Sequence, residues 1–238
     1  MWASEFYASK TVVVIGATSG IGLAIATAFR DAGAAVHATG ATDAEVASAS
    51  AGKITFQRLD VRDTAAIDAY AASFGSIAAL VDCAGVNLRA AEWEMQGFAA
   101  TLDINLTGAM RLALSFRPKL KDGAMLCMGS MFAFFGAPHA PAYAASKAGL
   151  VGLVKSLAVA MAHDPVRINA LAPGWIETAM TEVPRANPAR NAELLSRMPL
   201  GRWGRPEDVA PAALFLCSPL AAYITGAVLP IDGGYLVA

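Results

Sequence analysis

Charged side chains are scarce in this sequence. Lys, Arg, Asp and Glu make up 16% of its 238 residues, against roughly 25% in an average soluble domain. The 18 basic and 19 acidic residues nearly cancel, and no block of like charges occurs. These absences argue against electrostatic binding to nucleic acid or to an anionic membrane. Because so few charges leave much apolar surface to cover, we expect part of it to lie in a subunit interface.

Cysteine and histidine are also few. Cys83, Cys127 and Cys217 lie far apart in apolar settings without CxxC spacing, which predicts reduced structural thiols. The three histidines are scattered and no carboxylate cluster accompanies them, so we expect no metal site. The N-terminus has an early acidic residue and no apolar run before a cleavage site. This pattern predicts a cytoplasmic protein without a secretory signal.

Uninterrupted apolar runs that would span a membrane are missing too. Two stretches, 11–29 and 123–146, contain no Asp, Glu, Lys or Arg. Glycines interrupt the first, and glycines and prolines interrupt the second. Each stretch therefore predicts a strand, a turn and a helix, and we expect no membrane association.

The chain does contain short β-branched runs that alternate with longer alanine-rich segments of helical period. Strands are predicted at 11–15, 35–39, 54–58, 77–82, 124–128, 167–171 and 227–231, and helices near 21–32, 64–74, 96–117, 142–162 and 207–217. Several strands are apolar at successive positions, as is typical of parallel strands covered on both faces. The sequence predicts an α/β fold, a doubly wound Rossmann-type parallel sheet with helices on both faces, in a single domain over residues 1–238.

Helix ends and one irregular segment add detail. Asp63 and Thr64 are predicted to cap the helix near 64–74, and Pro206 with two following acidic residues predicts the start of the last helix.

A proline-rich stretch, 173–206, shows no clear helix or strand pattern. A segment of that length inside a compact domain is usually functional, so we expect a substrate lid near 175–205.

A glycine-rich turn follows the first predicted strand. The sequence Gly16-Ala-Thr-Ser-Gly20-Ile-Gly22 leads straight into a helix, so a phosphate could bind the N–H groups at the helix start. The glycines are spaced as GxxxGxG. The alternative to a phosphate site is a turn with a structural role only. Asp60-Val61 closes the third strand, where a carboxylate could accept from an adenine amine or cap the helix that begins near Asp63.

A second group of residues carries acid–base chemistry. Tyr143 and Lys147 are four apart in a predicted helix, so they project from one face. An ammonium beside a phenol lowers the phenol pKa by favouring phenolate. Ser130 follows the strand at 124–128, at the sheet edge where open α/β sheets bind ligands. Taken singly, these residues could be a surface aromatic, a solvated charge and a turn.

These motifs resemble those of the short-chain dehydrogenase/reductase family, and the resemblance runs nearly end to end, with 3-oxoacyl-ACP reductases among the similar members. It is carried by GATSGIG at 16–22, Asp60-Val61, Cys83-Ala84-Gly85, Asn105 within DINLTG, Ser130, Tyr143-Ala-Ala-Ser-Lys147, Pro173-Gly174 with Thr178, and Ile231-Asp232-Gly233-Gly234. Two departures stand out: the family often has Asn-Asn where this chain has Asp82-Cys83, and Thr where it has Ile15.

The resemblance implies an active site of Asn105, Ser130, Tyr143 and Lys147. Tyr143 would be the general acid or base, Ser130 would orient the substrate oxygen, and Lys147 would lower the tyrosine pKa and bind the nicotinamide ribose. Asn105 would hold a water that links Lys147 to solvent. The implied cofactor-binding residues are Gly16, Ser19, Gly20, Ile21, Gly22, Thr39, Gly40, Asp60, Val61, Ala84, Gly85, Tyr143, Lys147, Pro173, Gly174, Ile176 and Thr178.

The resulting functional hypothesis is an NAD(P)-dependent oxidoreductase that interconverts a secondary alcohol and a ketone. Alternatives are a non-catalytic redox sensor on the same fold, which would typically lack the Tyr or Lys, and a sugar-nucleotide epimerase, which would need a longer chain. The substrate could be a 3-oxoacyl compound, a polyol or sugar, or a cyclic ketone. Similar enzymes commonly pair through the helices near 96–117 and 142–162 and the C-terminal tail, so we expect a homotetramer.

The end of the second strand bears on cofactor choice. NAD-preferring enzymes usually place Asp or Glu where this chain has Gly40. Without that carboxylate, a 2′-phosphate could meet Thr39, Thr42 and backbone N–H groups. Neither Ala41 nor residues 17–19 supply a basic partner for it. The sequence therefore favours NADP(H), with NAD as the alternative and only modest discrimination.

Residues expected around the substrate are mostly apolar. Met131, Phe132, Phe134 and Phe135 follow Ser130, and Trp175 and Met180 open the predicted lid. They predict an apolar pocket entrance, although clustered aromatics are often core. Arg89 and His139 could bind a polar or anionic group, or could be plain surface residues.

Overall fold

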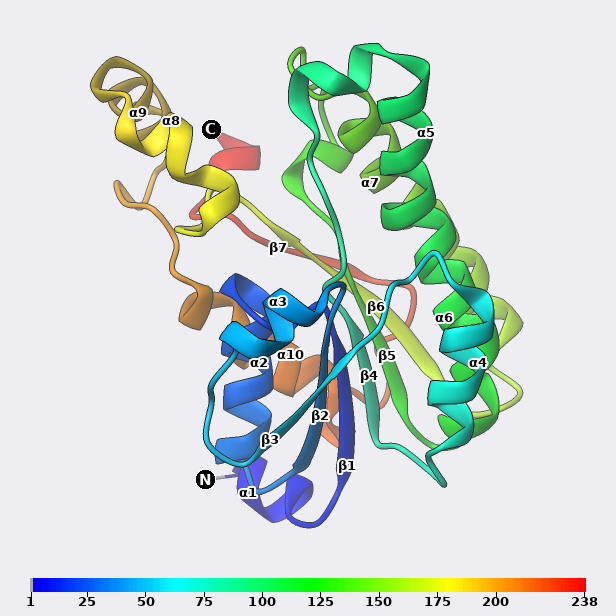
Figure 1. Ribbon diagram of the computed structural model, residues 1–238. Helices are drawn as coiled ribbons and strands as arrows, with labels where there is room; N and C mark the ends of the chain where they lie inside the picture. Colours follow the sequence, from blue (N-terminus) through cyan, green and yellow to red (C-terminus); the bar gives the residue numbers. More distant parts are fainter. Residues whose placement is uncertain (1) are drawn as a thin grey trace.

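Seven parallel strands form a single sheet in the computed structural model, which describes residues 2–238 (Figure 1). In spatial order they are β3 (Ile54–Arg58), β2 (Ala35–Gly40), β1 (Thr11–Ile15), β4 (Ala79–Asp82), β5 (Ala124–Met128), β6 (Arg167–Pro173) and β7 (Val228–Ile231). The order reverses between β1 and β4, and such a switch point opens a crevice at the carboxyl ends of the strands. The predicted doubly wound α/β fold is confirmed.

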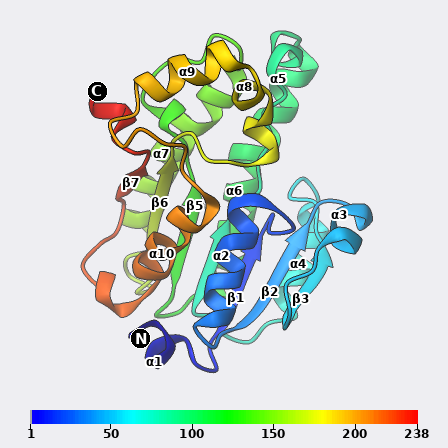
Figure 2. The ribbon, with the colours of Figure 1, turned by 90° about the vertical axis from the view of Figure 1, so that its left-hand side faces the viewer.

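Helices cover both faces of the sheet. The helices are α1 (Trp2–Tyr7), α2 (Gly20–Asp31), α3 (Asp43–Ser48), α4 (Thr64–Ala72), α5 (Met95–Leu102), α6 (Gly108–Phe116), α7 (Pro141–Ala160), α8 (Glu182–Ala186), α9 (Pro188–Ser196) and α10 (Pro206–Cys217). Helices α2 and α10 lie on one face, and α4, α6 and α7 lie on the other (Figures 1 and 2). No helix in the described part of the chain is long and apolar enough to cross a membrane.

The central strand β1 shows why the strands lack polar alternation. Val12 and Val14 belong to the core under α2 and α10, whereas Val13 and Ile15 belong to the core under α4, α6 and α7. Because both faces are covered, successive residues face opposite sides of the sheet and each meets an apolar layer. The sheet is thus held between two apolar cores.

Local signals located several helix ends correctly. The Asp63 side chain accepts from the Ala66 N–H at 3.0 Å and is the N-cap of α4, as predicted, whereas Thr64 is the first residue of that helix and not a cap. Pro206 is the first residue of α10. A proline fits there because the first helical N–H has no intrahelical partner.

Other expectations need correction. The predicted helix 96–117 is divided into α5 and α6 by one π-helical turn at Asp103–Thr107. The segment 173–206 is not irregular throughout, since it contains α8 and α9. Helix α3 was not expected, although Thr42 and Glu45 form a complete capping box at its start.

Candidate active site

The glycine-rich turn is built for close backbone approach at the start of α2. Gly16 and Gly20 have φ of +69° and +55°, a region that favours glycine. A Cβ on Gly22 would lie 2.2 Å from the Gly16 carbonyl oxygen. Ser19, the N-cap residue, makes no side-chain hydrogen bond to the helix. The helix start therefore offers N–H groups and positive dipole to an anion, which fits the phosphates of a dinucleotide.

Thr39 lies behind the glycine-rich turn, hydrogen-bonds to it and does not line the cavity. Its side chain is fully buried, and its Oγ1 accepts from the Gly16 N–H at 3.3 Å. Its carbonyl accepts from the Ala17 N–H at 2.8 Å. The expectation that Thr39 meets a phosphate does not fit this position, because its hydroxyl is enclosed beneath the turn.

One large cavity of about 1760 Å³ opens along the carboxyl ends of the strands. It is lined by most residues that the sequence placed in the site, namely Gly16, Ser19, Gly20, Ile21, Gly22, Asp60, Val61, Ala84, Gly85, Ser130, Tyr143, Lys147, Pro173, Gly174, Ile176 and Thr178. Thr39, Gly40 and Asn105 do not line it. Within residues 2–238, no group of His, Cys, Asp or Glu is placed to hold a metal ion.

Tyr143 and Lys147 come from the first turns of α7, and Ser130 follows β5. The Lys147 Nζ donates to the Met128 carbonyl at 2.7 Å and lies 5.5 Å from the centre of the Tyr143 ring. All three side chains are buried yet border the cavity. The arrangement brings a phenol, an ammonium and a hydroxyl to one wall.

Burial dominates the electrostatics of this group. It raises the pKa of Tyr143, a hydrogen bond from Ser130 opposes the rise, and the charge of Glu92 adds to it. Burial also lowers the pKa of Lys147, and Asp82 opposes that change. The lysine was expected to lower the tyrosine pKa, but in this arrangement desolvation of the phenol outweighs any such effect.

Asn105 sits behind the catalytic wall, in the π-helical turn between α5 and α6. Its amide nitrogen donates to the Val86 carbonyl and to Ser146 Oγ, and its Oδ1 accepts from the Val86 N–H at 2.8 Å. A Cβ on Gly85 would lie 3.4 Å from Asn105 Oδ1 and 3.5 Å from Lys147 Nζ. Asn105 therefore reaches the site through Gly85, and its predicted water contact stays a prediction.

The departure at Asp82-Cys83 places a carboxyl group under Lys147. Asp82 is buried and accepts from the Ala84 N–H at 3.1 Å. Burial raises its pKa to about 6, while the charge of Lys147 lowers it. Burial likewise raises the pKa of the Cys83 thiol, and all three cysteines are free.

Asp60 is held by a neighbour and not by the helix that follows. Its carboxylate accepts from the Arg62 guanidinium and N–H, and the closest contact is 2.6 Å. The Arg62 hydrogen bond keeps the pKa of Asp60 below its usual range. Since Asp63 caps α4 itself, Asp60 remains at the cavity wall, where an adenine is expected.

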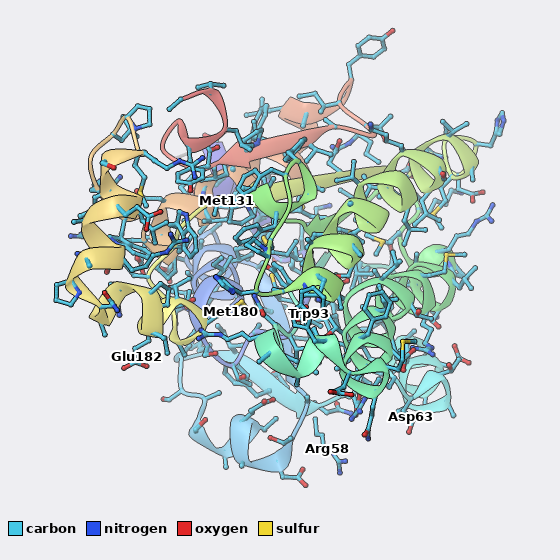
Figure 3. The ribbon with its side chains drawn as sticks, turned by 90° about the horizontal axis from the view of Figure 1, so that it is seen from above. Arg58, Asp63, Trp93, Met131, Met180 and Glu182 are labelled. Atoms are coloured by element: carbon cyan, nitrogen blue, oxygen red, sulfur yellow. The ribbon has the colours of Figure 1, made fainter. Side chains whose placement is uncertain are left out.

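The aromatic residues divide between pocket and core. Met131, Phe132, Trp175 and Met180 line the cavity. Phe135 packs beside Tyr235, and Phe134 is exposed. Figure 3 looks onto this end of the molecule, with Met131 and Met180 toward the middle and Glu182, the first residue of α8, pointing outward. The entrance is apolar, as expected, although fewer residues contribute than predicted.

Comparison with known proteins decides the family. A family model described as "Enoyl-(Acyl carrier protein) reductase" matches residues 16–236. The chain belongs to the short-chain dehydrogenase/reductase family. Cis-4-hydroxycyclohexanecarboxylate dehydrogenase of Sinomonas cyclohexanicum is 37% identical over 97% of this chain and 98% of that protein. A 3-oxoacyl-[acyl-carrier-protein] reductase of Thermotoga maritima is 35% identical over 96% of this chain and 98% of that protein.

Solved structures of this family agree with the fold. A Beutenbergia cavernae protein described as a "putative NAD(P) dependent gluconate 5-dehydrogenase", with NADP bound at low occupancy, has a TM-score of 0.90. It is 39% identical and covers 97% of this chain and 98% of its own. This short-chain dehydrogenase/reductase is therefore an NAD(P)-dependent oxidoreductase that acts on alcohol or ketone groups. Nothing supports the non-catalytic alternative.

Sequence reasoning missed two acidic residues at the site of this short-chain dehydrogenase/reductase. Glu92 is buried, and its Oε2 accepts from the Tyr143 backbone N–H at 2.9 Å. Glu45 lines the cavity beside the end of β2. The Thr42-to-Glu45 spacing of a capping box could have revealed the second, whereas no local signal marks the first.

Proposed function

We propose that Tyr143 is the general acid or base that moves the proton of the substrate oxygen, and that Ser130 orients that oxygen. The observation that carries this assignment is that three side chains meet at the cavity: Lys147 Nζ lies 5.5 Å from the centre of the Tyr143 ring, and Ser130 hydrogen-bonds to Tyr143. A nicotinamide cofactor, when bound, supplies or accepts the hydride. Lys147 holds positive charge beside the phenol, and Asn105 fixes the backbone behind it.

The chain's own residues fit that cofactor along the rest of the cavity. The turn from Gly16 to Gly22 would hold the pyrophosphate, and Asp60 with Val61 would meet the adenine. Ala84 and Gly85 would lie along the middle of the cofactor. Residues from β6 onward, Pro173, Gly174, Ile176 and Thr178, would hold the nicotinamide end.

Replacing the phenol tests the acid–base assignment. Tyr143→Phe should remove nearly all turnover, because the proton-transfer group alone is lost. Binding of the cofactor, measured by calorimetry, should stay close to wild type. Lys147→Ala should damage both turnover and binding. A Tyr143→Phe enzyme that keeps a substantial fraction of wild-type turnover would disprove the assignment.

For the substrate, we propose a secondary alcohol or ketone that carries a carboxylate on an apolar ring or chain. Phe132 and Trp175 line the apolar part of the cavity. Arg89 also lines it and donates to the Met180 carbonyl at 2.7 Å. Within the described chain Arg89 has no acidic partner, whereas a guanidinium matches a carboxylate well. A relative named for a cyclohexanecarboxylate supports this class, and a neighbour described as a putative gluconate 5-dehydrogenase supports the carboxylate alone.

A pair of ketones that differ only in charge tests the substrate class. With 4-oxocyclohexanecarboxylate, Arg89→Gln should raise KM by about tenfold, because one charge-assisted contact is lost. With cyclohexanone, the same variant should match wild type, and Arg89→Lys should restore part of the loss. Equal effects on both ketones would mean that Arg89 only supports the lid.

Three finer properties complete the proposal. The protein is expected in the cytoplasm. It is expected to be a homotetramer, with Leu114 on α6 and Val159 on α7 among the exposed apolar side chains that an interface would cover. For the cofactor, the sequence favoured NADP(H), and the NADP found in a related structure supports that choice. The Glu45 carboxylate beside Gly40 supports NAD(H) instead.

A further inference from the structure

We infer that Glu45 selects NAD(H) over NADP(H) by placing a carboxylate where the second strand ends. The cue is the surroundings of Gly40, which is the position where an acidic residue was expected and is absent. A Cβ on Gly40 would lie 3.2 Å from Glu45 Oε2. Thus the Glu45 carboxylate reaches, from α3, the space into which a side chain at position 40 would point. It also lines the main cavity, as does Ala41.

The same carboxylate uses the backbone donors that a 2′-phosphate would need. Glu45 Oε2 accepts from the Ala41 N–H at 2.6 Å and from the Thr42 N–H at 3.2 Å. The Thr42 hydroxyl oxygen accepts from the Glu45 N–H at 3.2 Å, which holds Thr42 in the capping box. The capping box therefore occupies the two N–H groups that the sequence offered to a phosphate.

Nearby cations do not offset this charge. Arg62 is bound by both oxygens of Asp60, and Arg58 lies 3.7 Å from Asp43 and donates to the Ala41 carbonyl at 3.4 Å. Glu45 has no Lys, Arg or His partner within residues 2–238. A phosphate brought to this end of β2 would meet an uncompensated carboxylate, whereas ribose hydroxyls could donate to it.

The position of α3 explains why the Glu45 carboxylate was not predicted at the end of β2. Helix α3 lies above the ends of β2 and β3, at the cavity end of the sheet (Figure 2). Thr42 ends the loop after β2, and the capping box turns the third residue of the helix back toward Gly40. Gly40 in turn has no room for its own side chain, since its Cβ would lie 2.6 Å from Thr18 Cγ2.

The test removes the charge and keeps the cap. In Glu45→Gln the amide oxygen can still accept from the Ala41 N–H, because Gln also serves in a capping box. Wild type should bind NAD⁺ about tenfold or more tightly than NADP⁺ by calorimetry without substrate, and Glu45→Gln should reduce that ratio by about fivefold or more. Glu5→Gln, the same change on α1, should leave the ratio as in wild type. Thermal unfolding of each variant checks that the fold is intact.

A second ligand pair isolates the 2′ position. 5′-AMP and adenosine 2′,5′-diphosphate differ only in the 2′-phosphate, and Glu45→Gln should improve binding of the second alone. A wild-type preference for NADP⁺ would overturn the inference, and so would a ratio that Glu45→Gln leaves within about twofold. The inference rests on nicotinamide binding and not on the proposed substrate. Failure of the Arg89 experiment would therefore leave this result unaffected.

Discussion

At the scale of single residues, burial of the Asp82 carboxyl group lowers the stability of the folded protein above about pH 4. Its pKa in the folded protein is raised to about 6, above the value of about 4 expected when unfolded. Between about pH 4 and about pH 6 the folded state binds more protons at Asp82 than the unfolded state does. Asp82 therefore carries no stability penalty below about pH 4, and the free energy of unfolding falls as the pH rises toward about 6. The penalty persists at neutral pH, where it is at most about 3 kcal/mol.

Asp82→Asn removes this titration and keeps an oxygen for the Ala84 N–H. The variant should gain stability relative to wild type as pH rises from about 4 to 7, with little difference at the lower end. Urea unfolding at fixed protein concentration across this range measures the difference. Part of the gain will be offset because Lys147 loses a neighbouring charge. A difference independent of pH would show that Asp82 is already neutral or well compensated when folded.

At the scale of elements, Glu92 links three segments around the start of α7. One oxygen accepts from the Leu88 N–H and from the Thr101 hydroxyl, and the other accepts from the Tyr143 N–H. Glu92→Gln replaces one acceptor with a donor, so we expect a loss of about 1–3 kcal/mol in unfolding free energy.

The same substitution should alter the pH dependence of alcohol oxidation. The charge of Glu92 raises the pKa of Tyr143, and alcohol oxidation needs Tyr143 deprotonated as the general base. Removing that charge should therefore move the increase of kcat/KM with pH to lower pH. Glu92→Asp keeps the charge and should leave the profile nearer to wild type. If Glu92→Gln lowers stability but leaves the profile unchanged, Glu92 is only a structural anchor.

The elements also show where sequence reasoning succeeds. Strands such as β1 and β5 were predicted because an apolar run buried on both faces is a local signal, and GATSGIG and YxxxK are local as well. The π-helical turn at Asp103–Thr107 was missed because no local pattern marks it; its Asn105 bonds Val86, 19 residues earlier in the chain. Glu45 was missed because the carboxylate at the end of β2 comes from the next helix.

At the scale of the whole molecule, the low charge content predicts an assembly. Leu114 and Val159 are exposed to 56% and 78% on α6 and α7, and Tyr223 near the C-terminal tail is fully exposed. Burying such side chains stabilises a complex by roughly 25 cal/mol per Å² of apolar surface. For the proposed homotetramer, light scattering at micromolar concentration should give four times the 24.5 kDa chain mass. Val159→Glu should weaken the assembly, because a carboxylate buried without a partner is costly, while Glu5→Gln, a change at an exposed residue of α1, should not. A wild-type mass of one chain would refute the tetramer and would leave the apolar faces of α6 and α7 open to solvent.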